Sequence, residues 1–176
     1  MKKKYTILSA LLIVLMAFAA TALKAQATNY SAHANCIYGF TKYVNWPDEK
    51  RIDDFVIGVV GDSPFIEKMI KIASLKMVGN QKIVIKKFSS LETKYDCHIL
   101  FINECENERI KQINDFTRGK SILIVTEFDD HAPEGSCINF LLSDNNKIKL
   151  EINTANLEKR NLKVASELLG FANIVD

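Results

Sequence analysis

Apolar strands and amphipathic helices alternate along the middle of this 176-residue chain, and that order limits the folds open to it. Short β-branched runs that suit buried strands cover 54–60 and 97–102, and helical patterns follow each of them at 64–73 and 105–117. A strand followed by a helix and another strand favours parallel βαβ units. We therefore expect an α/β fold: a mostly parallel sheet flanked by helices on both faces.

Further segments complete the predicted fold. Strands are expected at 82–88, 121–125, 138–142 and 148–152, and helices at 29–45 and 156–174. The last two strands are joined by Ser143-Asp144-Asn145-Asn146, a turn sequence, and so predict an antiparallel hairpin edge. The final helix, at the C-terminus, would present Leu162, Leu168 and Phe171 to the core, together with its other apolar residues.

The first 27 residues have the pattern of a secretory signal peptide. A lysine-rich start precedes an apolar run over 7–20, and small residues up to Ala27 fit a cleavage site there. An apolar run of about 14 residues is shorter than the roughly 20 that a membrane span needs. We expect a cleaved leader over 1–27, a periplasmic protein that does not insert into the membrane after cleavage, and one domain over 28–176.

Loss of the leader would change the charge of the protein. The whole chain has 23 Lys and Arg against 21 Asp and Glu, a formal net charge of +2. The leader holds four of the lysines and no acid, which leaves 19 basic against 21 acidic residues. No basic stripe is interleaved with aromatic residues. We therefore expect no nucleic-acid partner.

The four cysteines, at 36, 97, 105 and 137, are candidates for disulfides because an exported domain meets an oxidising compartment. Four cysteines allow three pairings, and the sequence does not choose among them. Cys105 follows the strand at 97–102, and Cys137 begins a strand expected to return antiparallel from 121–125, so we place both near one edge of the sheet. Cys105–Cys137 is the candidate disulfide, and four reduced, mostly buried thiols are the alternative.

A turn after the first strand is a candidate ligand site. Gly61, Asp62 and Ser63 join that strand to a helix, with Ser63 expected as the N-cap and Pro64 as the first helical residue. Helix N-termini at the carboxyl ends of strands are where α/β folds bind small ligands. The turn lacks the G-x-G-x-x-G spacing, so a bound anion and a simply capped helix are both open.

The residues give no sign of catalysis or metal binding. His33 and Cys36 stand three apart on one predicted helix, but no second pair has ligand spacing. Neither a Ser/His/Asp set nor a pair of acid/base carboxylates stands out. We expect no catalytic residue, no metal and no cofactor.

Tyr38, Tyr43 and Trp46 are the candidate partner-binding residues. Tyr and Trp make most interface hot spots, and the two tyrosines lie off the apolar stripe of the helix at 29–45. Trp46 stands at the end of that helix. The alternative is that Trp46 plugs the bottom of the sheet and Tyr43 packs beside it.

The segment 37–47, Ile-Tyr-Gly-Phe-Thr-Lys-Tyr-Val-Asn-Trp-Pro, resembles the opening signature of the YfiR-like (YfiR/HmsC-like) family of small periplasmic regulators. Six further segments match in the same order, at 57–62, 97–102, 121–126, 135–140, 150–153 and 166–169. The resemblance covers residues 35–174. It implies a non-enzymatic inhibitor: the family's best-known member contacts the periplasmic sensor domain of a membrane-bound diguanylate cyclase and responds to redox stress through disulfides.

The redox part of the resemblance does not carry over. In that member one disulfide joins a first-strand cysteine to the position of Cys97, and here Gly58 stands in the first strand. The other bridge lies in the loop after the fourth strand, where this chain has Cys137 alone. The partner implied is the periplasmic domain of an inner-membrane signalling protein, with a homodimer left open. The alternative function is a periplasmic small-ligand-binding module that feeds a sensor kinase or a transporter.

Overall fold

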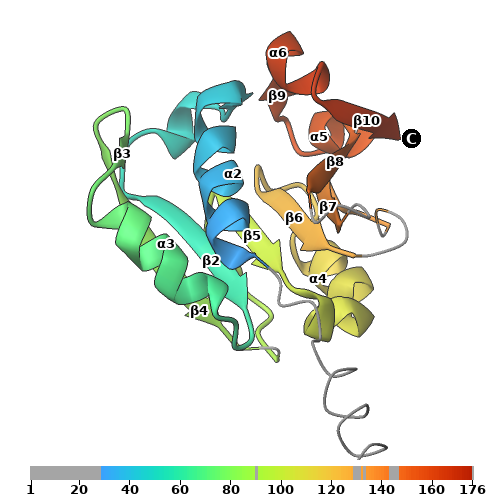
Figure 1. Cartoon of the computed structure of the whole chain (residues 1–176), viewed down its shortest axis with the longest axis horizontal. Coiled ribbons are helices and arrows are strands. Elements are labelled where there is room, and N and C mark those ends of the chain that lie inside the picture. The colour runs from blue at the N-terminus through green and yellow to red at the C-terminus, as the bar shows by residue number, and fades with distance from the viewer. Residues whose placement is uncertain (1–28, 90, 129–131, 133, 143–146, 176) are drawn as a thin grey trace, which may run out of the picture.

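The computed structural model describes residues 29–175, with the exception of 90, 129–131, 133 and 143–146 (Figure 1). The predicted leader and the predicted turn at 143–146 lie outside the described residues. In the described part of the chain, no helix has both the length and the apolar character that crossing a membrane requires.

An eight-stranded sheet forms the centre of the molecule (Figure 1). Its strands are β2 (Phe55–Val60), β3 (Met77–Val78), β4 (Gln81–Phe88), β5 (Ile99–Ile102), β6 (Leu123–Glu127), β7 (Ile138–Leu142), β8 (Ile148–Asn153) and β10 (Ala172–Val175). Their order is β10-β8-β7-β6-β5-β2-β4-β3. Neighbours from β4 to β7 are parallel, and β7 and β8 form the antiparallel hairpin. The predicted sheet class and hairpin are confirmed.

Helices cover both faces of this sheet. They are α2 (Tyr30–Tyr43), α3 (Phe65–Ala73), α4 (Ile110–Phe116), α5 (Thr154–Lys159) and α6 (Ser166–Leu169), with 3-10 turns η1 (Asp48–Lys50) and η2 (Glu104–Arg109). The β2–α3–β4 and β5–α4–β6 connections run in opposite directions along the sheet. Because such crossovers are right-handed, α3 and α4 lie on opposite faces.

Aromatic rings fill the layer between the sheet and the α2–α3 pair. Phe65 of α3 lies 4.3 Å from Phe101 of β5, and Phe40 of α2 lies 5.9 Å from Phe140 of β7, measured between ring centroids. All residues of β5 and β6 are buried, as an apolar strand covered on both faces must be. The core therefore runs along the whole centre of the sheet.

The continuous final helix expected over 156–174 is wrong. The segment breaks after α5, where Asn161 takes a left-handed backbone with φ of 54°, a conformation that Asn tolerates better than most residues. A short strand β9 (Lys163–Val164), the helix α6 and the strand β10 follow. Phe171, expected in the core, is 80% exposed. An apolar segment with helical spacing therefore splits because β1 (Val44–Asn45) and β8 each offer it an edge for strand pairing.

Three smaller expectations also need correction. β7 runs parallel to β6 and does not return antiparallel, because Val125, Thr126 and Glu127 pair in a parallel ladder with Ile138, Asn139 and Phe140. The helix expected at 105–117 is divided into η2 and α4. The helix α3 begins at Phe65, one residue later than expected, with Pro64 immediately before it; Ser63 Oγ still accepts a hydrogen bond from the Phe65 N–H at 3.2 Å.

Candidate functional site

A cavity of about 320 Å³ opens where the parallel strands β2 and β5 begin. Trp46 forms one wall: it is buried, its indole N–H donates to the backbone carbonyl of His98 at 3.2 Å, and its ring meets Phe55 edge-on at 5.1 Å. Pro47, which follows it, keeps Trp46 out of the helical conformation, so α2 ends before the tryptophan. The end of α2 thus places an aromatic ring under the sheet.

His98 is held beside this cavity as a neutral imidazole. Its Nδ1 accepts from the Val56 N–H at 3.0 Å, so its Nε2 carries the proton and donates to the Lys50 carbonyl at 2.7 Å. Burial is the main cause that lowers the pKa of His98. The ring stacks on Phe55 at 4.4 Å. The histidine therefore ties η1, β2 and β5 together, and its proton is fixed in place by two backbone groups.

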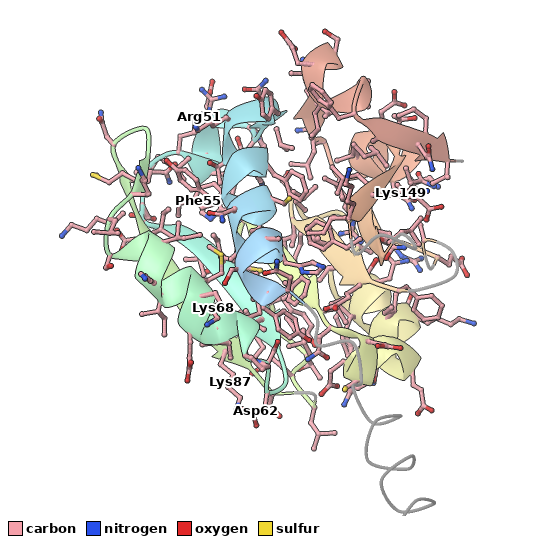
Figure 2. All side chains as sticks on the ribbon, viewed as in Figure 1. Arg51, Phe55, Asp62, Lys68, Lys87 and Lys149 are labelled. Atoms are coloured by element: carbon pink, nitrogen blue, oxygen red, sulfur yellow. The ribbon has the colours of Figure 1, made fainter. Side chains whose placement is uncertain are left out.

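The remaining lining of the cavity is mixed: Val44 and Val78 are apolar, and most of the other side chains are polar or positively charged. Lys50, Arg51 and the Gln81 amide line it, and no carboxylate is among its lining residues in the described part of the chain. Arg51 donates to the Trp46 carbonyl at 3.3 Å. In Figure 2, Arg51 and Phe55 lie at the opposite end of β2 from Asp62 and Lys87. An aromatic wall with cations beside it suits a small organic anion that has a flat apolar part.

The predicted partner-binding residues do not form one surface. Trp46 is buried, as the alternative interpretation expects, whereas Tyr43 is 38% exposed at the end of α2. The Tyr43 carbonyl accepts from the Ala165 N–H at 2.8 Å, which ties α2 to the C-terminal segment next to the β1–β9 pair. Tyr38 is half-buried, and the Lys42 ammonium lies 5.4 Å from its ring centroid. Only Tyr43 presents a substantially exposed ring to a partner.

The turn at Gly61, Asp62 and Ser63 lies at the carboxyl end of β2, as predicted. The charge of Asp62 is offset by an ion pair with Lys87, but the Glu106 carboxylate lies so close to Gly61 that an added Cβ would collide with it. Like charges repel an incoming anion. This arrangement does not favour the anion site suggested by the sequence, and a ligand at this turn stays an untested prediction.

The candidate disulfide partners, Cys105 and Cys137, belong to different parts of the fold. Cys137 pairs with Ile124 at the beginning of β7, whereas Cys105 lies in η2, beyond the end of β5. In the strand order β6 stands between β5 and β7. The Cys105–Cys137 disulfide stays an untested prediction. Both thiols are free, Cys137 buried and Cys105 exposed. The parallel direction of β7 removes the premise of the pairing.

Gly58 of β2 is the residue that the family resemblance sets against a first-strand cysteine. Gly58 pairs with Leu100 in the β2–β5 ladder, and Cys97 lies two residues before β5 begins. A Cβ at Gly58 would lie 2.5 Å from Cε2 of Phe88. Burial raises the pKa of Cys97 to about 12. A Phe88 ring therefore fills the space of the missing side chain, and Cys97 is an unreactive core thiol.

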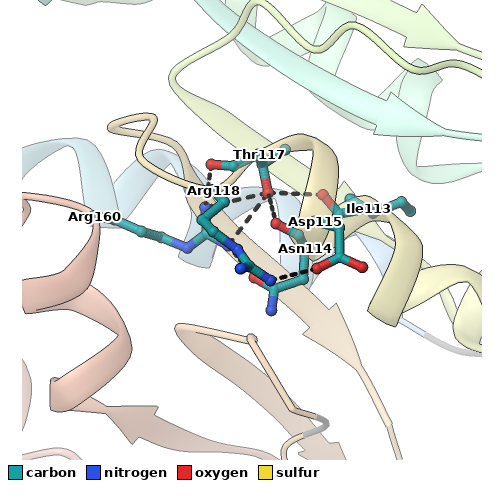
Figure 3. A network of polar contacts seen from close by, with 6 residues as sticks. All are labelled: Ile113, Asn114, Asp115, Thr117, Arg118 and Arg160. Carbon is teal, nitrogen blue, oxygen red and sulfur yellow. Dashed lines mark hydrogen bonds and ion pairs between the residues drawn. The ribbon is translucent and has the colours of Figure 1, made fainter.

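Sequence reasoning missed a buried arginine that ties α5 to α4 (Figure 3). Arg160 donates to Oδ1 of Asn114 at 2.6 Å and to the Thr117 carbonyl at 3.1 Å. Its guanidinium also donates to Oγ1 of Thr117 at 3.3 Å, and burial lowers the pKa of Arg160. In the described residues these acceptors are neutral, without a carboxylate. The sequence gives no signal for this role, because nothing in the local pattern distinguishes Arg160 from the lysines and arginines of the surface.

Residues suited to a metal centre are not brought together. Across the described ranges, no three His, Cys, Asp or Glu side chains are grouped so that they could hold a metal ion. His33 and Cys36 remain on α2, and His33 is buried, with its ring 4.5 Å from that of Phe140 and at right angles to it. His33 therefore belongs to the core.

Comparison with known proteins gives one clear match. The model of the family described as YfiR/HmsC-like matches residues 30–173. This range includes α2, the cavity, the whole sheet as far as β10 and the Arg160 network. None of the curated proteins matches the chain.

Proposed function

Because the chain belongs to the YfiR/HmsC-like family, whose members are periplasmic regulators of diguanylate cyclases, we propose that it binds the periplasmic domain of such a cyclase and changes its output. The family match over residues 30–173 is the observation that carries this proposal. The protein acts by binding and without catalysis, after its leader is removed and it reaches the periplasm.

The amino end of the sheet supplies the contact surface in this proposal. Tyr43 is exposed there, Arg51 carries a half-exposed guanidinium, and the β1–β9 pair braces the backbone beneath them. Tyr and Arg are the residue types that most often dominate binding energy. Rigid backbone under such side chains lowers the entropy lost on binding.

Deletion of the gene tests the kind of function. We expect the cyclic-di-GMP level to rise in the deletion strain and to return when the wild-type gene is supplied. Complementation with Tyr43→Ala should restore it less completely, while Leu91→Ala, which removes another exposed apolar side chain outside this surface, should act as wild type. An unchanged cyclic-di-GMP level in the deletion strain would contradict the proposal.

Direct binding gives an independent measurement. Calorimetric titration of the purified protein with the isolated periplasmic domain of a diguanylate cyclase from the same organism should give saturable binding. Tyr43→Ala should weaken that binding by roughly tenfold, the effect of losing about 1.4 kcal/mol at a hot spot. Equal affinities of the wild type and Tyr43→Ala would show that the contact does not lie at the amino end of the sheet.

A small-ligand-binding module is the second candidate, and the Trp46 cavity favours it. Trp46 is the only tryptophan of the chain, so its fluorescence reports on the cavity directly. Addition of small aromatic carboxylates should change its emission and raise the melting temperature, and Arg51→Ala should weaken both effects. If no compound of the series changes the emission or the melting temperature, the ligand-binding function is rejected and the regulatory function stands.

A further inference from the structure

The side chain of His98 joins backbone groups of two different elements. Its Nδ1 accepts from the Val56 N–H of β2 at 3.0 Å, and its Nε2 donates to the Lys50 carbonyl of η1 at 2.7 Å. The residue is buried, and its ring lies 4.4 Å from that of Phe55. A backbone N–H only donates and a carbonyl only accepts, so these neighbours suit a single form of the ring, the neutral one with its proton on Nε2.

A second proton on this ring is incompatible with the arrangement. It would turn Nδ1 into a donor that faces the Val56 N–H, so this hydrogen bond would be lost. A charge would also be placed among buried groups without a new partner. The backbone of His98 does not share this dependence, because its N–H donates to the Val56 carbonyl at 2.8 Å whatever the state of the ring. Protonation therefore acts on the ring and on what the ring holds.

The charged groups around His98 do little to stabilise a cationic ring. The Lys50 ammonium of η1 opposes the charged form, whereas the Asp96 carboxylate before β5 favours it. These two side chains form an ion pair at 3.6 Å, and that of Asp96 is 92% exposed. Arg51 adds a further cation beside the ring, and Gln81 of β4 is neutral. The other carboxylates of the 48–54 turn belong to exposed residues, namely Asp48, Glu49, Asp53 and Asp54.

The 48–54 turn, which comprises η1 and the residues leading to β2, is held by few contacts besides this ring. The Gln81 amide donates to the Lys50 carbonyl at 3.0 Å and also to the Asp53 carbonyl. Arg51 donates to the Trp46 carbonyl at 3.3 Å. The turn η1 has no buried residue, and the residues between it and β2 are exposed. Hydrogen bonds, and not apolar burial, therefore decide whether this turn stays on the sheet.

We propose that His98 is an acid-sensitive latch: when its ring takes up a second proton, it leaves Val56 and Lys50, and the 48–54 turn comes away from the amino end of the sheet. The only covalent change is the transfer of a proton from solvent to Nδ1. The movement opens the Trp46 cavity on the side that Lys50 and Arg51 line. The use of the latch in regulation rests on the proposed function, because Arg51 belongs to the contact surface proposed there. The latch itself does not.

The fluorescence of Trp46 reports on the latch. Trp46 is the only tryptophan of the chain, and its ring centroid lies 6.3 Å from that of His98. We expect one step in its emission, with a midpoint below pH 6.5, because burial lowers the pKa of His98 from this ordinary value. His98→Asn offers an amide oxygen to the Val56 N–H and does not titrate, so it should remove the step. His33→Phe removes another buried histidine and should keep it.

Hydrogen exchange locates the movement. Below the midpoint, the amides of 48–56 should lose roughly tenfold in protection after correction for the intrinsic rate, the effect of about one lost hydrogen bond. The amides of β6 should keep their protection. Gln81→Ala removes the second donor to the Lys50 carbonyl, so it should move the midpoint of the emission step to higher pH. This variant and the wild-type exchange decide the question even if His98→Asn does not fold.

Three results would overturn the latch. They are an emission that stays constant until the whole protein unfolds, a step that survives His98→Asn in a folded protein, and a loss of protection that is equal in β6 and in the 48–54 turn. Binding of the cyclase domain at neutral and mildly acidic pH is measured separately. Binding that is absent at both pH values contradicts the proposed function, whereas the emission and exchange data still decide whether the latch exists.

Discussion

The indole N–H of Trp46 donates to the backbone carbonyl of His98, and the imidazole of the same histidine holds the Lys50 carbonyl. One residue of the loop before β5 thus fixes both the aromatic wall of the cavity and the turn that carries its cations. The cavity is therefore an organised part of the fold, and its lining can be tested by substitution.

Replacement of Trp46 should separate packing from hydrogen bonding. Trp46→Ala should lower the free energy of unfolding by roughly 3–5 kcal/mol, the usual effect of deleting a large buried ring. Trp46→Phe should cost less, because the His98 carbonyl keeps its hydrogen bond from the Leu123 N–H at 2.8 Å. Urea denaturation followed by circular dichroism measures both. Equal losses for the two variants would mean that the ring does not pack as the structure shows.

The stability of the protein should fall in mild acid because of His33. Burial lowers the pKa of His33 from its ordinary value of 6.5, so the unfolded chain binds a proton more readily than the folded one. The contribution of neutral His33 to the free energy of unfolding is fully present above pH 6.5, and it is lost as the pH falls from 6.5 towards the lowered pKa of the folded protein. The lowered pKa of His98 acts in the same direction.

Urea titrations between neutral pH and pH values just above the carboxyl range check this dependence. His33→Phe keeps an aromatic ring against Phe140 and removes the titrating group, so its slope of stability against pH should be shallower than that of the wild type. The residual slope should come from His98. Stability that rises as the pH falls through this window would show that the sign is wrong.

Loss of the buried guanidinium should destabilise the attachment of α5 to α4. Arg160→Met should cost about 2–3 kcal/mol, because it removes hydrogen bonds from a charged donor to Asn114 and Thr117. Arg118→Met is the matched control in the same region (Figure 3): that side chain is 79% exposed and pairs with Asp115, so its loss should cost under about 1 kcal/mol. Chemical denaturation measures the free energy of unfolding of both variants. Equal losses of stability would contradict the buried position of Arg160.

Two glycines should respond in opposite ways to the same substitution. Gly58→Ala should destabilise the protein by roughly 1–3 kcal/mol, because the new methyl would overlap Phe88 in a packed core. Gly39→Ala on α2 should stabilise it by up to about 1 kcal/mol, since nothing lies within 4 Å of the added Cβ and alanine favours the helix. Thermal unfolding of the two variants compares them. A neutral Gly58→Ala would show that Phe88 can move aside, which would reopen the route to a bridge with Cys97.

The main elements followed from local pattern. Apolar β-branched runs predicted β2, β5 and the β7–β8 hairpin, and helical spacing predicted α2 and α3, because each pattern matches a period that the backbone itself imposes. The family signature likewise lay in the sequence. The C-terminal segment shows the limit: its helical spacing is real, but the open edges beside β1 and β8 turned parts of it into strands.

By itself, the sequence determined the class of the sheet, the position of the first helix and the family. Only the tertiary structure decided that β7 runs parallel to β6, that Cys137 is a buried free thiol while Cys105 is an exposed one, and that Trp46 and His98 share one cavity. It also placed Arg160 and His33 in the interior. The reason is physical: periodicity reports which side of an element is apolar, whereas strand direction and side-chain pairing depend on segments far apart in the chain.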